Sequence, residues 1–200
     1  MIYVVGIGPG HRDYILGKAI KTLEKVDKII GFSRAIDAVD FIDNKKEKIE
    51  SLLEIIKRVE EFNGDIAVVA SGDPTFFGVS SYINKKTTKE VEVIPGLSAF
   101  QYMTSKLNKP WSFAYTGSMH AREDSFIDKI KENKLSIWLC DKKNTPNKLC
   151  ESLLDLECNI YIGENLSYEN EKLVFGKPQD FIDKEFSDMS ILMIELIEKK

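Results

Sequence analysis

Three glycine-rich segments in the first half of the chain bring together residue types that suit ligand binding. They are Gly6-Ile7-Gly8-Pro9-Gly10, Ser71-Gly72-Asp73-Pro74 and Pro95-Gly96-Leu97-Ser98-Ala99. Glycine lets the backbone approach a ligand closely, and Asp73 can accept hydrogen bonds from an amine, a hydroxyl or backbone amides. The alternative interpretation is structural, because Asp73 and Ser98 are also residue types that cap helices.

The first segment is similar to a dinucleotide-binding turn, G-x-G-x-x-G, but departs from that pattern. Its third glycine arrives one residue early, and Pro9 lacks a backbone N–H donor. The second predicted strand, residues 28–31, ends without the acidic residue that would hold a ribose. An NAD-dependent oxidoreductase is therefore an alternative that the sequence disfavours.

An alternation of strands and helices is needed to position these segments. Apolar runs predict strands, and helical periodicity predicts helices between them. The predicted strands are residues 1–5, 28–31, 65–70 and 90–94, and the predicted helices are residues 15–26, 47–62, 76–83 and 97–107. This order is typical of a largely parallel sheet with helices on both faces. Since the carboxyl ends of parallel strands lie at one edge of a sheet, the three glycine segments should meet there.

The pattern changes after Asn108-Lys109-Pro110, so we predict an α/β protein of two domains, residues 1–109 and 112–200. Strands are predicted more densely in the second half, with fewer helices between them, which favours a mixed sheet. The predicted strands are residues 112–116, 135–139, 159–163, 171–175 and 190–196, and the predicted helices are residues 124–132 and 146–156.

The composition restricts the classes of function. The chain of 200 residues is 43% hydrophobic, and its net charge of −4 argues against binding to nucleic acid. No run approaches the roughly 20 apolar residues of a membrane span, and no signal peptide is evident. Three cysteines without C-x-x-C spacing predict free thiols in a cytoplasmic protein. Two histidines, with no cysteine or acid at ligand spacing, predict that no metal is bound by the protein.

Taken together, the order and spacing of the three glycine segments resemble the tetrapyrrole methylase superfamily, whose members transfer a methyl group from S-adenosylmethionine. The resemblance implies a two-domain fold with the active site in the cleft between the domains. It also implies which residues hold the methyl donor. These are Ser71, Gly72, Asp73, Phe76, Ser98, Ala99, Leu139 and Leu166.

Two segments of the second half narrow this resemblance. Residues 116–122, Thr-Gly-Ser-Met-His-Ala-Arg, and residues 163–168, Gly-Glu-Asn-Leu-Ser-Tyr, are similar to segments of the cobalt-precorrin C5-methyltransferases of cobalamin biosynthesis. Ala121 stands where that family has glycine. Methylation of another ring carbon, or of RNA or protein, by an enzyme of the same superfamily is the nearest alternative, and a non-catalytic ligand-binding subunit is a further one.

The resemblance implies that the substrate is a cobalt-precorrin and that any cobalt arrives inside it. His120 is the candidate catalytic residue, which either removes a proton from the ring or positions the macrocycle. Pro9, Arg12, Arg122 and Tyr168 are the candidate substrate-binding residues, since arginine grips the carboxylate arms of such a ring with two parallel hydrogen bonds. A homodimer is implied, and a separate decarboxylating C15-methyltransferase is the expected pathway partner.

Overall fold

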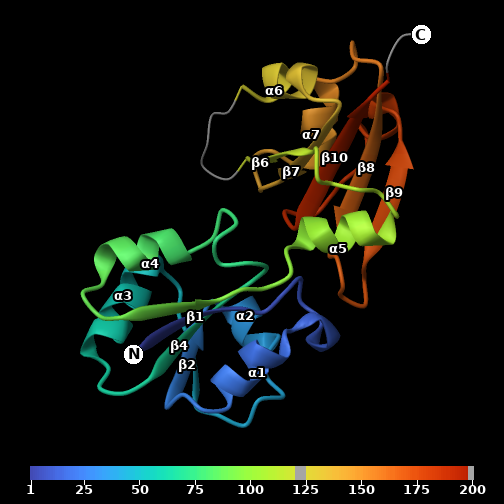
Figure 1. Ribbon diagram of the computed structural model, residues 1–200. Coiled ribbons are helices and arrows are strands. Elements are labelled where there is room, and N and C mark those ends of the chain that lie inside the picture. The colour runs from blue at the N-terminus through green and yellow to red at the C-terminus, as the bar shows by residue number, and fades with distance from the viewer. Residues whose placement is uncertain (120–124, 198–200) are drawn as a thin grey trace. The chain divides into compact units, whose positions relative to one another are not determined.

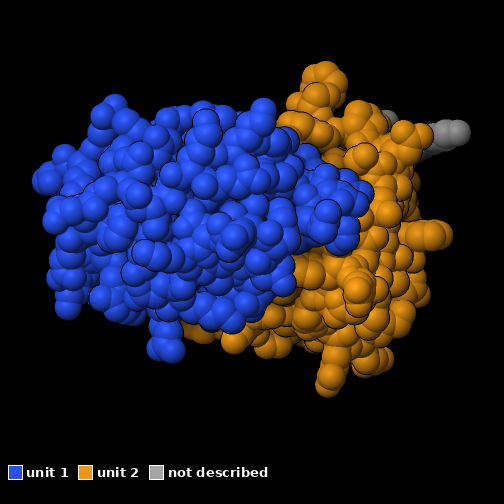
Figure 2. Space-filling view, turned by 90° about the horizontal axis from the view of Figure 1, so that it is seen from below, with its two compact units in different colours: residues 1–99 blue, residues 100–200 orange. Residues whose placement is uncertain are grey.

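The computed structural model describes residues 1–119 and 125–197 (Figure 1). The described chain forms two compact units, residues 1–99 and 100–200 (Figure 2). The division at residues 109–112, which the sequence predicts for the domains, stays a prediction. No helix of the described residues is long and apolar enough to span a lipid bilayer.

Unit 1 is built on a five-stranded sheet in the order β3-β2-β4-β1-β5, and all its strand pairs are parallel (Figure 1). The strands are β1 (Ile2–Gly6), β2 (Lys28–Gly31), β3 (Lys46–Lys48), β4 (Ile66–Ala70) and β5 (Val91–Ile94). In the centre, Val4 lies opposite Val68 on one side and Val93 on the other. Near-continuous apolar strands of this kind are expected where helices cover both faces of a parallel sheet.

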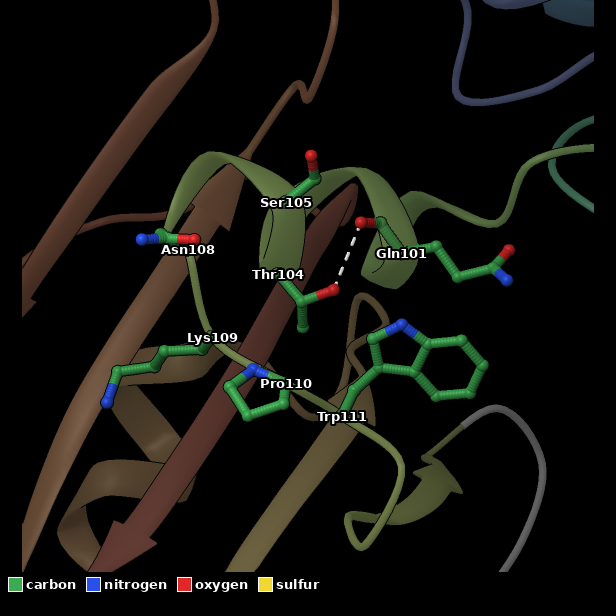
Figure 3. A pocket seen from close by; sticks show the side chains of 7 residues that line it. All are labelled: Gln101, Thr104, Ser105, Asn108, Lys109, Pro110 and Trp111. Carbon is green, nitrogen blue, oxygen red and sulfur yellow. Dashed lines mark hydrogen bonds between the residues drawn. The ribbon is translucent and has the colours of Figure 1, made fainter.

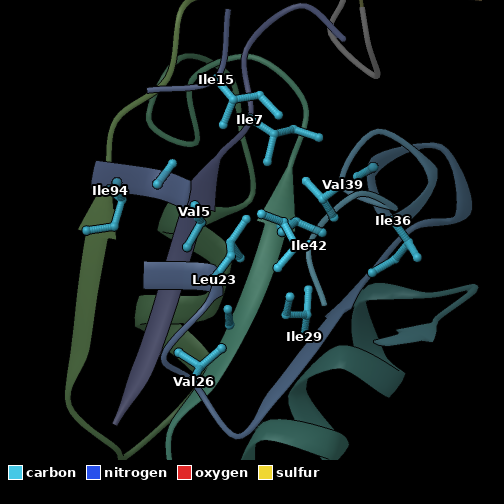
Figure 4. Packing of buried hydrophobic residues seen from close by; sticks show 14 residues of the cluster. Val5, Ile7, Ile15, Leu23, Val26, Ile29, Ile36, Val39, Ile42 and Ile94 are labelled. Atoms are coloured by element: carbon cyan, nitrogen blue, oxygen red, sulfur yellow. The ribbon is translucent and has the colours of Figure 1, made fainter. Parts of the chain in front are cut away.

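Helices cover both faces of this sheet. Alternate residues of each central strand point to opposite sides, so each face presents apolar side chains against which helices pack. On one face, Val5 and Val69 pack in a cluster with Leu23 of helix α1 (Gly17–Leu23) and Ile36 of helix α2 (Ser33–Asp37) (Figure 4). The other face is covered by helices α3 (Leu52–Glu61) and α4 (Ser80–Lys86). The predicted α/β layering is confirmed.

The helix predicted at residues 47–62 begins five residues too early. Residues 46–48 instead form the edge strand β3, in which Glu47 lies opposite Ile30. A run of charged residues does not look like a strand in sequence, yet charge is common on sheet edges because it discourages aggregation. Helix α3 begins after Ser51, whose hydroxyl accepts a hydrogen bond from the Glu54 N–H at 3.2 Å.

The helix predicted at residues 76–83 also begins too early. The backbone at Phe77 has a φ of +51°, which interrupts a helix. Helix α4 begins at Ser80, whose N–H and hydroxyl both donate to the Pro74 carbonyl oxygen, at 3.1 and 2.6 Å. The segment between Asp73 and Ser80 is consequently a compact loop.

The described part of unit 2 contains a mixed five-stranded sheet in the order β6-β7-β10-β8-β9. The strands are β6 (Tyr115–Ser118), β7 (Leu135–Leu139), β8 (Cys158–Glu164), β9 (Lys172–Gly176) and β10 (Ser190–Leu196). Strands β6 and β7 are parallel, and the remaining neighbours are antiparallel. The prediction of a mixed second sheet is confirmed.

The helices of unit 2 are α5 (Ala99–Lys106), α6 (Phe126–Glu132) and α7 (Pro146–Glu151). Helices α6 and α7 contribute to a core around Trp138, which is fully buried. On the opposite face of the sheet, Lys109, just after α5, forms an ion pair with Glu195 at 2.9 Å, and the Tyr161 hydroxyl donates to the same carboxylate at 3.0 Å.

Candidate active site

The carboxyl edge of the first sheet contains a change of direction between neighbouring strands. The connection from β1 leads to α1 on one face, whereas the connection from the adjacent β4 leads to α4 on the other face. In parallel α/β sheets, ligands bind outside the carboxyl ends of the strands at such a point. The segments at Gly8 and Gly72 lie on its two sides.

The three glycine segments meet at this edge, as the sequence predicts. Gly8 and Gly72 form a backbone bridge in which each N–H donates to the other's carbonyl oxygen, at 3.3 and 2.7 Å. A Cβ added at Gly6 would lie 2.6 Å from the Gly96 nitrogen and 2.8 Å from the Gly72 carbonyl oxygen. These glycines are therefore needed for three backbone segments to pack against one another.

Asp73 ties two of these segments together. Its carboxylate accepts hydrogen bonds from the Thr75 N–H at 2.7 Å, from the Thr75 hydroxyl, and from the Gly96 N–H at 3.1 Å. Partial burial would raise the pKa of Asp73, but these donors outweigh it and hold the pKa below its usual value. The ionised Asp73 carboxylate therefore joins the second and third segments by hydrogen bonds, and it does not cap a helix.

A side-chain atom at Gly72 would not overlap the rest of the protein. A Cβ added at Gly72 would have the Ser98 Cα, at 3.9 Å, as its nearest neighbour, whereas at Gly6 the added atom would overlap backbone. The φ of +68° at Gly72 is also a conformation that favours glycine. A ligand can therefore approach the backbone at Gly72 more closely than at Gly6, which is compatible with the methyl donor that the sequence predicts there.

The other predicted donor-binding residues of unit 1 differ in exposure. Ser71 is exposed, Ala99 is half-buried, and Ser98 is buried. Phe76 is half-buried and meets Phe77 edge to face, with ring centroids 4.7 Å apart. Phe77 is 39% exposed, so neither phenylalanine is fully buried.

Two predicted substrate-binding residues follow β1. Pro9 is buried in the glycine segment, between two glycines with positive φ. Arg12 begins a short 3₁₀ helix (Arg12–Tyr14), and its guanidinium lies over the Phe41 ring, 5.5 Å from the centroid. With its side chain 69% exposed, Arg12 can reach an anionic group in solution.

The second sheet brings two of the predicted residues of unit 2, Leu139 and Leu166, to one edge. Ser118, Leu139, Ile191 and Gly163 are successive partners across β6, β7, β10 and β8. Leu166 is buried, and its side chain lies where a Cβ at Gly163 would be. The segments after β6 and β8, which carry the resemblance to C5-methyltransferases, therefore start from the same edge.

The segment after β8 has an unusual backbone that the sequence does not reveal. Asn165 and Ser167 have φ angles of +49° and +70°, which are uncommon for residues other than glycine. The buried Glu164 holds its start, since its carboxylate accepts the Ser187 N–H at 2.6 Å. Tyr168 is half-buried, and its N–H donates to the Asn165 carbonyl oxygen at 3.0 Å. Asn165, a residue type that tolerates positive φ, is the one local signal for this turn.

The candidate catalytic residue His120 and the candidate substrate-binding residue Arg122 lie outside the described residues. Within the described ranges, no group of three or more His, Cys, Asp or Glu side chains is arranged to hold a metal ion.

A pocket of about 430 Å³ lies beside the end of α5 in unit 2, and no predicted site residue lines it (Figure 3). Its lining residues are Gln101, Thr104, Ser105, Asn108, Lys109, Pro110 and Trp111. Lys109, the cation among them, points away from the Trp111 ring and is paired with Glu195 (Figure 3). Apart from this paired lysine, the pocket is lined by neutral polar groups, a proline and one indole, and we assign it no part in the methyl-donor site.

Three relatives match nearly the whole chain or most of it. The probable cobalt-precorrin-7 C(5)-methyltransferase of Methanocaldococcus jannaschii is 32% identical over 98% of both chains. The cobalt-precorrin-7 C(5)-methyltransferase of Salmonella typhimurium is 27% identical over 86% of this chain and 89% of its own. A probable cobalt-precorrin-2 C(20)-methyltransferase of M. jannaschii is also 27% identical, over 96% of this chain and 94% of its own.

Solved structures share the fold of the chain. A precorrin-6Y methylase from Archaeoglobus fulgidus has a TM-score of 0.78 at 23% identity and covers 99% of both chains. A uroporphyrin-III C-methyltransferase from Thermus thermophilus, solved with S-adenosylhomocysteine, has a TM-score of 0.78 at 15% identity, over 97% of this chain and 91% of its own. The model of one family, the Tetrapyrrole (Corrin/Porphyrin) Methylases, matches residues 1–181. Since this match covers most of the chain, the chain belongs to the tetrapyrrole methylases.

Proposed function

We propose that the protein transfers a methyl group from S-adenosylmethionine to carbon C5 of a cobalt-precorrin in cobalamin biosynthesis. The observation that carries this proposal is the 32% identity, over 98% of both chains, to a relative named for that reaction. Membership of the methylase family confirms the predicted enzyme class, a methyltransferase that uses S-adenosylmethionine. It argues against the alternative of an NAD-dependent oxidoreductase.

The donor lies, in this proposal, against Gly72 and Ser98 and contacts Ser71, Asp73, Phe76 and Ala99. Leu139 and Leu166 are further contacts. The space beside Gly72 supports this assignment. The sulfonium of the donor is the electrophile, and an electron-rich ring carbon is the nucleophile. The protein's contribution is alignment of the two reacting atoms to about 3–3.5 Å and exclusion of water. The hydrogen bond from the Gly96 N–H to Asp73 serves that alignment by fixing the loop that follows β4.

The macrocycle is held, in the same proposal, by Pro9, Arg12, Arg122 and Tyr168, and His120 positions it. Methyl transfer from a sulfonium depends more on alignment than on acid–base help, which favours positioning over proton removal. A His120→Ala variant should then show a raised KM with a small change in kcat. A fall in kcat of roughly 10²–10⁴-fold would instead identify His120 as the base.

A homodimer in the cytoplasm, with a separate C15-methyltransferase in the same pathway, completes the proposal. Cys140, Cys150 and Cys158 are buried free thiols, which supports a reducing compartment. The oligomeric state can be measured by light scattering of the purified chain. A monomer at micromolar concentration would contradict the dimer.

The test of the reaction uses the purified chain, cobalt-precorrin-7 and S-adenosylmethionine with a ¹³C-labelled methyl group. Mass spectrometry should show the addition of one methyl group, and NMR should place the label at C5. Replacement of the donor by S-adenosylhomocysteine is the control. A label at another ring carbon would support the second candidate function, methylation of a different carbon of the macrocycle. The match to the C(20)-methyltransferase favours this candidate. Binding without transfer would support a non-catalytic subunit.

A further inference from the structure

Glu171 lies between the Gly-Glu-Asn-Leu-Ser-Tyr segment and strand β9, and its carboxylate links that segment to helix α5. One oxygen, Oε2, accepts the Ser167 N–H at 2.7 Å. The other, Oε1, lies 3.6 Å from the Lys106 ammonium, and the Tyr102 hydroxyl also hydrogen-bonds to the carboxylate. Tyr102 and Lys106 are four residues apart on α5 and therefore face the same side of it.

The side chain of Glu171 is 20% exposed, so these bonds form in a partly desolvated place. Burial alone would raise the pKa of Glu171, but the donors from Ser167, Tyr102 and Lys106 lower it below its usual value. The group is therefore a carboxylate anion, and hydrogen bonds to an anion are stronger than those between neutral groups.

The bond to Ser167 falls where the backbone is strained. The φ angles of +49° at Asn165 and +70° at Ser167 are left-handed conformations of residues that carry a Cβ. Each is unfavourable for such a residue and persists only where the surroundings fix it. The start of the segment is fixed by Glu164 through Ser187. The end of the segment is fixed by the Ser167 N–H, which donates a hydrogen bond to the Glu171 carboxylate.

We infer that Glu171 is a positioning residue, which holds Ser167 in its left-handed conformation and thereby orients the adjacent Tyr168 toward the macrocycle. The inference rests on the proposed function, which assigns Tyr168 to the macrocycle. Leu166 needs no such support, because its buried side chain packs against Gly163. Loss of the carboxylate should therefore affect the macrocycle and leave the methyl donor unaffected.

The test compares Glu171→Ala, Glu171→Gln and the control Glu169→Ala, an exposed acid in the same loop. Hydrogen–deuterium exchange reports the Ser167 amide, absorbance titration gives the Kd of cobalt-precorrin-7, and calorimetry gives the Kd of S-adenosylhomocysteine. In Glu171→Ala, Ser167 exchange should accelerate and the macrocycle Kd should rise about tenfold, which matches the loss of one hydrogen bond to a charged group. The S-adenosylhomocysteine Kd should stay unchanged.

Glu171→Gln keeps an acceptor for the Ser167 N–H, so it should restore slow exchange and recover most of the macrocycle affinity. This variant also serves if Glu171→Ala does not fold. Unchanged Ser167 exchange in Glu171→Ala, or faster exchange with an unchanged macrocycle Kd, would overturn the inference. Neither binding nor exchange requires turnover, so a wild-type protein that binds the macrocycle without methylating it would contradict the proposed function and not the role of Glu171.

Discussion

Replacing Gly72 by alanine adds one methyl group to the place where the methyl donor is proposed to lie. Its φ of +68° is a conformation in which a Cβ costs about 1–2 kcal/mol. The added Cβ would have its nearest neighbour, the Ser98 Cα, at 3.9 Å, which is an ordinary van der Waals distance. No clash within the protein adds to the backbone cost. The free energy of unfolding should therefore fall by about 1–2 kcal/mol and not further.

Binding of the donor should suffer more than stability. A methyl group forced into an occupied, well-packed space typically costs about 1–3 kcal/mol, which is roughly a 5- to 150-fold rise in Kd. Calorimetry with S-adenosylhomocysteine measures this Kd, and urea unfolding measures the free energy of the fold. The two measurements separate a blocked site from a damaged protein.

Gly17→Ala is the matched control, because a Cβ at Gly17 meets no atom within 4 Å and this residue begins helix α1. It should leave the Kd unchanged and stabilise the protein by about 0.4–1 kcal/mol. A folded Gly72→Ala variant that binds S-adenosylhomocysteine with wild-type affinity would refute the placement of the donor beside Gly72. A fall in the free energy of unfolding well beyond about 1–2 kcal/mol would show that the added Cβ clashes with the protein.

Two further predictions follow from ionisable groups. Asp73→Asn should lower stability by about 1.5–3 kcal/mol, because an amide cannot accept from both the Thr75 and the Gly96 N–H groups as the carboxylate does. Since donors hold the pKa of Asp73 below its usual value, its contribution is present above about pH 4 and is lost as the pH falls through the lowered pKa. Urea unfolding between pH 3 and 7 should show this loss in the wild type and not in the variant, and identical profiles would contradict it. Burial raises the pKa of the Cys140 thiol, and it raises that of the Cys150 thiol to about 12. Both thiols should therefore react with a disulfide reagent at pH 8 only after the protein unfolds. Fast labelling of the folded protein would show that the two thiols are accessible and would contradict this prediction.

The sequence by itself determined the strands with long apolar runs and the family. Strands β2, β7 and β10 run over the residues predicted from their apolar patterns. The glycine segments predicted that three strand ends meet at one edge of the first sheet, and the structure brings the segments together there. The resemblance to the tetrapyrrole methylases, based on the order of those segments, is confirmed by the family match.

The tertiary structure alone decided which groups act on one another. Strand β3 forms from charged residues because β2 offers it an edge, and α4 starts at Ser80 because the Pro74 carbonyl oxygen accepts its N–H. The Asp73 carboxylate reaches an N–H 23 residues further on, at Gly96. Periodicity is a local property of the chain, whereas these bonds depend on which strands are neighbours and in what register. The positive φ at Ser167 and the bond from its N–H to Glu171, four residues further on, are local in sequence, yet no pattern of residue types predicts them.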